Sequence, residues 1–229
     1  MGCGLSFPKV PLSRDKVVVV TGGNTGIGYE NAKWLAMMGA HVIIACRSEE
    51  RALKFMKLDC ASLKSTEDFI SEFKAKESRL HLLILNAGIS TYGLEYTEDN
   101  FESMFHVNYL SQVLLSIKLL PTMMRSGDDC RVIFISSYAH NWGEVDVETI
   151  QARQFTTENF DKMKYYGNSK LFQIEVPTLD GHLPRLYWSP YKGSTTQTNA
   201  AINPKYKGVR DVYFASCKPK TPNSKARYA

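Results

Sequence analysis

The sequence has no apolar run close to the 18 residues that a membrane-spanning helix needs, and no secretory leader is predicted. Its five cysteines are scattered and contain no CxxC pair, which argues against a disulfide framework and favours a reducing compartment. The five histidines are equally scattered, so no metal site is predicted. Basic and aromatic residues do not interleave, and nucleic-acid binding is therefore not predicted either.

The net charge of +5 is concentrated near the C-terminus. Residues 202–229 hold seven Lys or Arg and one Asp, while the rest of the chain is nearly neutral. Two interpretations of this segment stay open, contact with an anionic lipid surface or a solvated tail. We predict a leader at residues 1–14, one domain at residues 15–217 and a disordered basic tail at residues 218–229.

The order of apolar segments predicts a doubly wound α/β domain with a parallel sheet. Short apolar or β-branched runs predict buried strands at 16–20, 41–46, 54–59, 80–85 and 131–136. Helical spacing predicts helices from residue 29 to the capping Gly39, over 98–120 and over 158–175. Ser65 and Asp68 have the spacing of a capping box that opens a further helix.

A glycine-rich stretch, TGGNTGIG at 21–28, lies between the first strand and the first helix. Free N–H groups at a helix N-terminus favour a pyrophosphate, and a Cβ in the turn would hold the phosphates away. A plain turn is the alternative interpretation, but the strand-loop-helix context favours a cofactor site.

The TGxxxGxG spacing and the residues that follow it resemble the short-chain dehydrogenase/reductase superfamily, and most closely its retinol-dehydrogenase-like branch. The resemblance runs from residue 16 to about residue 174 and implies a Rossmann-type domain. It places cofactor contacts in the glycine loop, in LDCAS (58–62) and in NAG (86–88), with Asp59 reaching the adenine. With the end of the second strand included, the residues expected to contact the dinucleotide are Gly22, Asn24, Thr25, Gly26, Ile27, Gly28, Arg47, Asp59, Cys60, Asn86, Ala87 and Gly88.

The same resemblance implies a catalytic set. HVNYL supplies Asn108, and YYGNSK supplies Tyr166 and Lys170. ISS offers Ser136 or Ser137, and the alignment of the motif favours Ser137. Two other tyrosines are assigned structural roles. Tyr29 precedes Lys33 by four residues, the same spacing as Tyr166 and Lys170, and Tyr165 has no Lys four residues later.

The residue types suit hydride-transfer chemistry. A phenol has a reference pKa of about 10, and the ammonium of Lys170 one helical turn away would lower the pKa of Tyr166, as would an oxidised nicotinamide. Tyr166 would then exchange a proton with an alcohol while hydride moves to or from the cofactor. Ser137 would hydrogen-bond the carbonyl oxygen. By analogy with the family, Asn108 would hold a water that links Lys170 to solvent.

The end of the second strand bears on the choice of cofactor. An acidic residue there would bind the ribose 2′-hydroxyl and select NAD(H). This chain has Cys46 and Arg47, with no carboxylate before Glu49. Arg47 suits a 2′-phosphate, so NADP(H) is favoured over NAD(H).

Two segments are shorter than the family pattern. Retracing a six-residue strand takes about 20 Å, whereas the seven residues 47–53 cover about 10 Å as a helix and about 24 Å when extended. We therefore predict a strap in place of the second crossover helix. After Lys170, Pro177 ends the helix, no Pro-Gly pair follows, and the substrate-binding segment is shortened. Residues 206–222 resemble the C-terminal strand of the family.

Two functions stay open. The first is an NADP(H)-dependent oxidoreductase that interconverts an alcohol and a carbonyl, with a retinoid, a steroid or another lipophilic molecule as substrate. The second is a catalytically impaired remnant, or a splice or gene-model fragment, that binds a dinucleotide or acts by pairing with an intact homologue. A small-molecule substrate and a homo-oligomer are the expected partners.

The opening residues MGCGLS bear on location. Gly2 and Ser6 fit the N-myristoylation pattern, and Cys3 could accept a palmitoyl group as a second anchor. We expect a cytoplasmic protein, with acylation at Gly2 and Cys3 as the route to a membrane surface. Chance occurrence of so short a pattern is the alternative interpretation.

Overall fold

A computed structural model describes residues 10–48, 54–175, 185–188, 193–209, 212–215 and 218–220. Gly2, Cys3, Ser6, Glu49, Pro177 and Cys217 lie outside the described residues. The strands form one sheet in the order β3-β2-β1-β4-β5-β6-β7-β8, parallel except for the last pair. The strands are β1 (Val17–Thr21), β2 (His41–Cys46), β3 (Lys54–Lys57), β4 (Leu82–Leu85), β5 (Arg131–Phe134), β6 (Arg185–Trp188), β7 (Val212–Ala215) and β8 (Lys218–Lys220).

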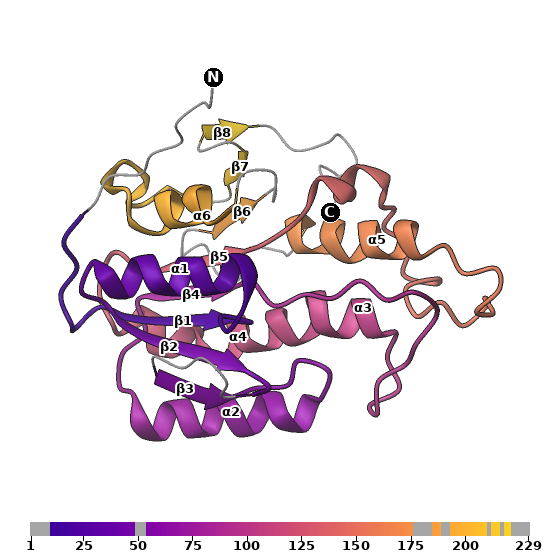
Figure 1. Ribbon diagram of the computed structural model, residues 1–229, viewed down its shortest axis with the longest axis horizontal. Helices are drawn as coiled ribbons and strands as arrows, with labels where there is room; N and C mark the ends of the chain where they lie inside the picture. Colours follow the sequence, from indigo (N-terminus) through magenta and orange to yellow (C-terminus); the bar gives the residue numbers. More distant parts are fainter. Residues whose placement is uncertain are drawn as a thin grey trace.

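The helices cover both faces of the sheet, as predicted for a doubly wound domain (Figure 1). Helices α1 and α6 lie on one face, and α2 and α4 lie on the other. The helices are α1 (Gly26–Met37), α2 (Leu63–Lys76), α3 (Ser103–Phe105), α4 (Ser111–Met124), α5 (Lys162–Glu175) and α6 (Gly193–Ile202). Shorter turns are the π-helical η1 (His106–Leu110) and the 3₁₀ turns η2 (Tyr138–Trp142) and η4 (Pro204–Tyr206).

The first strand shows how the core is divided. All five residues of β1 are buried, because parallel strands covered on both faces are apolar throughout. Val17 and Val19 pack in a cluster with Phe69 of α2 and with residues of α4. Val18 and Val20 point to the opposite face and pack in a cluster with Leu35 of α1. The strand is thus fixed from both sides, and the loop that follows it starts from a rigid position.

The short connection between β2 and β3 spans less distance than the sequence predicts. β3 pairs with the second half of β2, so that Lys54 lies beside Ile43. From Cys46 the chain therefore retraces three residues, about 10 Å, instead of a whole strand. The strap predicted for residues 47–53 lies mostly outside the described residues, while the parallel pairing expected for residues 54–59 is confirmed for Lys54–Lys57.

Several predicted boundaries were wrong. The cap of α2 is Ser62, whose side chain accepts from Ser65 N, so Ser65 lies inside the helix rather than at its start. The helix expected over 98–120 begins at Ser103, contains the π-turn η1, and continues through Pro121 to Met124. The helix expected from residue 158 begins at Lys162, because the carboxylate of Asp161 accepts from the N–H groups of the first turn.

The C-terminal part of the sheet is more complete than predicted. No strand was expected between Lys170 and residue 206, yet β6 pairs with β5 and with β7. The short segment RLYW gave no clear strand pattern beside its prolines. β8 also lies inside the tail that was predicted to be disordered from residue 218, and it pairs with β7. The expected C-terminal strand is confirmed as β7.

Candidate active site

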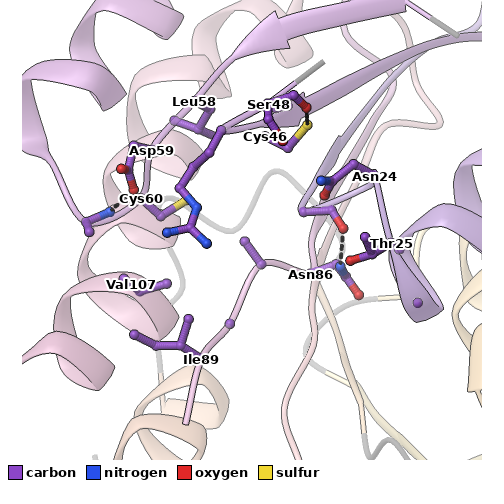
Figure 2. A pocket seen from close by; sticks show the side chains of 18 of the residues that line it. Asn24, Thr25, Cys46, Ser48, Leu58, Asp59, Cys60, Asn86, Ile89 and Val107 are labelled. Atoms are coloured by element: carbon purple, nitrogen blue, oxygen red, sulfur yellow. Dashed lines mark hydrogen bonds between the residues drawn. The ribbon is translucent and has the colours of Figure 1, made fainter. Parts of the chain in front are cut away.

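A cavity of about 640 Å³ opens at the carboxyl ends of the strands, where the strand order reverses between β1 and β4. In doubly wound sheets this edge is where ligands bind. Figure 2 shows Asp59 and Cys60 on one side of the cavity and Asn24 and Thr25 on the other. Every residue predicted to contact a dinucleotide lines this cavity, namely Gly22, Asn24, Thr25, Gly26, Ile27, Gly28, Arg47, Asp59, Cys60, Asn86, Ala87 and Gly88.

The glycine loop is held tightly against the end of β4. Asn86 Nδ2 donates to Thr21 O at 3.0 Å and to Gly22 O at 3.3 Å. A Cβ on Gly28 would lie 2.4 Å from both Asn86 Nδ2 and Gly22 O, so no other residue fits there without displacing the loop. Gly22 also has a φ of +62°, which L side chains rarely adopt.

Thr21 and Gln112, which the sequence analysis did not identify, connect the loops that line the cavity. Thr21 Oγ1 accepts from Asn86 N at 2.9 Å and from Ala87 N at 3.0 Å, and it donates to Gln112 Oε1 at 3.1 Å. Gln112 Nε2 lies 3.3 Å from the sulfur of Cys60. A hydroxyl residue at the end of a buried strand was the available sign of this role.

The N-terminus of α1 fits an anion such as a pyrophosphate. Thr25 precedes the helix but makes no side-chain cap, and the first turn contains no acidic residue. The first-turn N–H groups therefore remain available, and the helix dipole favours negative charge there. Gly26 has a φ of +56°, and a Cβ built on it would meet nothing within 4 Å, so the backbone is open at this point. The residues present thus fit a dinucleotide.

The far side of the cavity contains both charged groups of the lining. Arg47 and Ser48 follow β2 and are exposed. Asp59 is the only carboxylate among the lining residues, and its Oδ1 accepts from Ala61 N at 2.9 Å. The Cys46 thiol donates to Ser48 O at 3.1 Å, and burial raises the pKa of this thiol. The Cys46 thiol therefore stays protonated at neutral pH.

A second cavity of about 210 Å³ adjoins the first and contains Tyr166 and Lys170 in its lining. The two cavities share Ile27, Asn86, Gly88 and Ile89. The structure therefore brings the predicted tyrosine and lysine next to the predicted cofactor site. A group that extends from the glycine loop past Gly88 would reach them.

Ser137 and Ser136 have different surroundings. The Tyr166 hydroxyl is hydrogen-bonded to the side chain of Ser137. Ser136 Oγ instead donates to the backbone oxygen of Lys170 at 2.6 Å and is almost completely buried. Of the two serines offered by the sequence, Ser137 is therefore the one beside the phenol.

A close backbone contact holds Ser137 against α5. A Cβ on Gly143 would lie 2.6 Å from Gly167 O, and a Cβ on Gly167 would lie 2.7 Å from Ala139 O. Asn168 Oδ1 also accepts from Glu144 N at 2.8 Å. The turn η2 and α5 thus approach each other more closely than side chains would allow. Neither glycine follows a recognisable spacing, and the sequence analysis missed both.

The effect of Lys170 on Tyr166 differs from the prediction. Lys170 Nζ lies 5.7 Å from the centre of the Tyr166 ring. Burial nevertheless raises the pKa of Tyr166 above its ordinary value, and the hydrogen bond from Ser137 opposes this increase only in part. The pKa of Lys170 itself is lowered to about 8 by burial, so the group is mostly charged at pH 7 and loses its charge just above neutrality.

Asn108 lies in the π-turn η1 and is completely buried. Its Oδ1 accepts from Ile89 N at 2.7 Å, while its Nδ2 donates to Ile89 O at 2.9 Å and to Ser169 Oγ at 2.9 Å. The side chain therefore fixes the strand end after Gly88. Its Oδ1 and Lys170 Nζ both lie within 3.3 Å of the position that a Cβ on Gly88 would take.

The Tyr29–Lys33 pair and Tyr165 lie outside both cavities. The Tyr165 hydroxyl donates to Thr149 O at 2.9 Å, and its ring packs against Phe160. Lys33 pairs at 3.8 Å with Glu30 on the exposed side of α1. Neither Tyr29 nor Tyr165 lines either cavity.

The burial of Lys170 predicts a pH dependence of stability. The unfolded chain keeps the ordinary lysine pKa of 10.5, so between pH 8 and 10.5 it binds more protons than the folded chain. The free-energy cost of burying the Lys170 charge is fully present below pH 8 and disappears as the pH rises to 10.5. Relative to Lys170→Met, the unfolding free energy of the wild type should rise by about 3 kcal/mol over this range.

Urea unfolding at several pH values measures this difference. The groups that titrate elsewhere are the same in both proteins, so subtraction removes their effects. A wild-type minus variant difference that does not change with pH would show that Lys170 is not buried as a cation.

Residues 16–149 match the family model described as short chain dehydrogenase. The chain is 33% identical to mouse retinol dehydrogenase 12, over 93% of this chain and 81% of that protein. It is 37% identical to human polyprenol dehydrogenase, over 80% of this chain and 59% of that protein. A crystal structure of an uncharacterized protein from Mycobacterium paratuberculosis superimposes with a TM-score of 0.76 at 26% identity, over 94% of this chain and 88% of that chain.

The fold and the site define a doubly wound α/β protein with a glycine-lined cavity at the edge of the sheet where the strand order reverses. The chain belongs to the short chain dehydrogenase family, in its retinol-dehydrogenase-like branch. It spans 59% of the human polyprenol dehydrogenase and 65% of a zebrafish WW domain-containing oxidoreductase to which it is 30% identical over 93% of its own length. None of the helices in the described ranges is long and apolar enough to cross a membrane.

Proposed function

We propose that this chain is an NADP(H)-dependent oxidoreductase that interconverts an alcohol and a carbonyl. The observation that carries the proposal is that Tyr166 and Lys170 line the cavity that adjoins the glycine loop, with Ser137 hydrogen-bonded to Tyr166. Residues from β1, β4, β5 and α5 converge there, although they lie far apart in the sequence. Family membership is consistent with this chemistry.

The residues have separate roles in the proposed reaction. A bound nicotinamide dinucleotide supplies or accepts the hydride. In alcohol oxidation the Tyr166 oxygen takes the hydroxyl proton, and in carbonyl reduction it returns a proton to the same oxygen. Ser137 donates a hydrogen bond to the substrate oxygen, where negative charge develops. Lys170 places a positive charge behind the phenol, which favours its ionised form.

Tyr166 needs its neighbours because its pKa is raised by burial. A phenol with a raised pKa is well suited to give a proton, which favours carbonyl reduction as the easier direction at neutral pH. In the opposite direction, the positive charges of Lys170 and of an oxidised nicotinamide would both lower that pKa. We therefore expect alcohol oxidation to accelerate as the pH rises.

Arg47 is the basis of the proposed NADP(H) preference. It lines the cavity at the end of β2, the place where the 2′ position of the ribose is recognised in this fold. A guanidinium can bind a phosphate with two hydrogen bonds. Arg47→Asp replaces this partner with an acceptor for a 2′-hydroxyl, so the NADPH-to-NADH affinity ratio should fall by about tenfold or more.

Fluorescence titration with NADPH and with NADH measures both affinities. Arg14→Asp is a matched control, because it makes the same change of charge at an exposed position that does not line the cavity. Equal affinity of the wild type for the two dinucleotides would contradict the assignment.

The substrate is proposed to be a lipophilic alcohol or carbonyl. The names of the relatives refer to a retinol and a polyprenol, which are lipophilic alcohols. In this chain, apolar side chains are exposed on the turn that follows Ser137 and at the start of α5. They are Tyr138, Trp142 and Met163, with exposed fractions of 61%, 53% and 44%.

The test is the oxidation of NADPH by the purified chain in the presence of a series of aliphatic and polyene aldehydes. A thermal melt first establishes that the protein is folded. The proposal predicts oxidation that depends on the aldehyde. A folded chain that binds NADPH without turnover would favour the alternative function, a dinucleotide-binding remnant, which the short β2–β3 connection supports.

Homo-oligomer formation, acylation at Gly2 and Cys3, and a cytoplasmic or membrane-surface location stay predictions from the sequence.

A further inference from the structure

Gln173 is a completely buried side chain that follows Lys170 by almost one turn of α5. Its Oε1 accepts from Lys170 Nζ at 3.2 Å, and its Nε2 donates to the backbone oxygen of Asn108 at 2.7 Å. The amide therefore connects Lys170 on α5 with Asn108 in the π-turn η1, which are both members of the proposed catalytic set. The family analogy predicts a water that is held by Asn108 and links Lys170 to solvent, and Gln173 adds a direct side-chain connection between Lys170 and the Asn108 backbone.

We infer that Gln173 is a positioning residue for the proposed reaction, which holds Lys170 Nζ and the turn carrying Asn108 in one hydrogen-bonded unit. The inference rests on the proposed function, because its effect on turnover acts through Lys170 and Tyr166. Gln173 lines neither cavity, so it is not placed to touch cofactor or substrate.

The orientation of the Gln173 amide is fixed by its two partners. An ammonium has only donors, and a backbone oxygen has only acceptors. Rotating the amide by half a turn would place its NH₂ against the Lys170 ammonium and its oxygen against Asn108 O. Both contacts would then be repulsive, so one orientation satisfies the network.

The remaining contacts of Lys170 show what this arrangement leaves available. Lys170 Nζ also donates to Ile135 O at 3.0 Å. Two of its three N–H groups are thus occupied, which leaves one for a group in the cavity beside Gly88. Without Gln173, the flexible lysine side chain would have one fixed partner, and its ammonium could turn away from the phenol.

The electrostatic surroundings of Lys170 contain few competing groups. Tyr166 is the titratable side chain that faces it, at 5.7 Å from Nζ to the ring centre. From β5 and from η1 the facing groups are the Ile135 oxygen and Asn108, which do not titrate. Within the described residues, no charged partner contributes to the pKa of Lys170. Gln173 Oε1 and the Ile135 oxygen are therefore the two acceptors that the structure provides for the Lys170 ammonium.

Three variants separate positioning from a purely structural role. Gln173→Met has a similar length and makes neither hydrogen bond. Gln173→Glu keeps an acceptor for Lys170 Nζ. Gln197→Met is the matched control, because Gln197 is another completely buried glutamine that bonds to Asn31 on the opposite face of the sheet.

The first readout is the pKa of Lys170, measured by NMR of ¹³C-labelled lysine Cε and assigned with Lys170→Met. Gln173→Met should lower this pKa by about one pH unit, because it removes a hydrogen bond to the charged form. Gln173→Glu should raise it, and Gln197→Met should leave it unchanged. An unchanged pKa in Gln173→Met would overturn the inference, whether or not the chain turns over substrate.

The second readout is turnover with NADPH and an aldehyde. Gln173→Met should lower kcat by about tenfold with the NADPH KM within about twofold, and Gln173→Glu should recover part of that loss. A loss of kcat that merely follows the loss of folded protein, as in Gln197→Met, would overturn the inference. If the wild type shows no turnover but the pKa of Lys170 moves as expected, the proposed function fails and the connection through Gln173 stands.

Discussion

Tyr166→Phe is expected to lower kcat by about a thousandfold or more while NADPH affinity stays within about twofold of the wild type. The variant keeps the aromatic ring, which packs against the cluster of Met104, Ala152 and Tyr165, and removes only the oxygen proposed to exchange the proton. Because Tyr166 lines the second cavity and not the main one, its hydroxyl is not needed to hold a dinucleotide. Steady-state kinetics and fluorescence titration measure the two quantities separately.

Tyr165→Phe is the matched control for this prediction. It removes a hydroxyl from the adjacent residue, where the group donates to Thr149 O instead of facing the cavity. We expect a small loss of stability and little change in kcat. Near-normal turnover in Tyr166→Phe, or an equal loss in both variants, would show that the acid–base group has been assigned wrongly.

Gly28→Ala is expected to weaken dinucleotide binding by about a hundredfold or more. The new methyl group would lie 2.4 Å from Asn86 Nδ2 and from Gly22 O, and neither the strand end nor the glycine loop can move without reshaping the cavity. The same displacement would break the bonds from Asn86 to Thr21 and Gly22. Calorimetric titration with NADPH measures the loss.

Gly93→Ala provides the comparison. A Cβ on Gly93 would meet a single methyl group, Thr157 Cγ2, at 3.1 Å, and Gly93 lines neither cavity. This variant should bind NADPH as the wild type does. If Gly28→Ala also binds normally while its melting temperature is unchanged, the glycine loop does not form the phosphate site.

The sequence predicted those features that depend on local chemistry. The buried strands and the glycine loop below α1 follow from apolar runs and from spacing. The proposed catalytic residues came from the family resemblance, and all twelve residues predicted to contact a dinucleotide line one cavity. Arg47 belongs to this group, because the end of β2 is defined by the strand itself. The choice of Ser137 over Ser136 also follows the predicted alignment.

Features that depend on tertiary contacts could not be predicted. Gln112 and Gln173 each contact a residue more than 50 positions away, and no local pattern identifies a buried amide that makes such a contact. The raised pKa of Tyr166 results from burial, which outweighs the expected effect of Lys170. β6 was missed because RLYW is too short and too close to prolines for its pairing with β5 to be apparent.

The β2–β3 connection shows a different limit. The number of residues between the two strands is read directly from the sequence. The distance that they must span depends on the strand register, which the sequence does not specify when both strands are apolar. Pairing of Lys54 with Ile43 shortens the return path. The strand pair therefore forms with the residues available, and Arg47 keeps its place at the edge of the cavity.

Calorimetric titration of the folded, full-length chain with NADPH and with NADH tests the central claim most directly, because every proposed step requires a dinucleotide in the cavity at the edge of the sheet where the strand order reverses. The account predicts one site per chain and tighter binding of NADPH than of NADH. It also predicts that Gly28→Ala loses the binding of both dinucleotides. A chain with a single cooperative thermal transition that binds neither dinucleotide at millimolar concentration would contradict it.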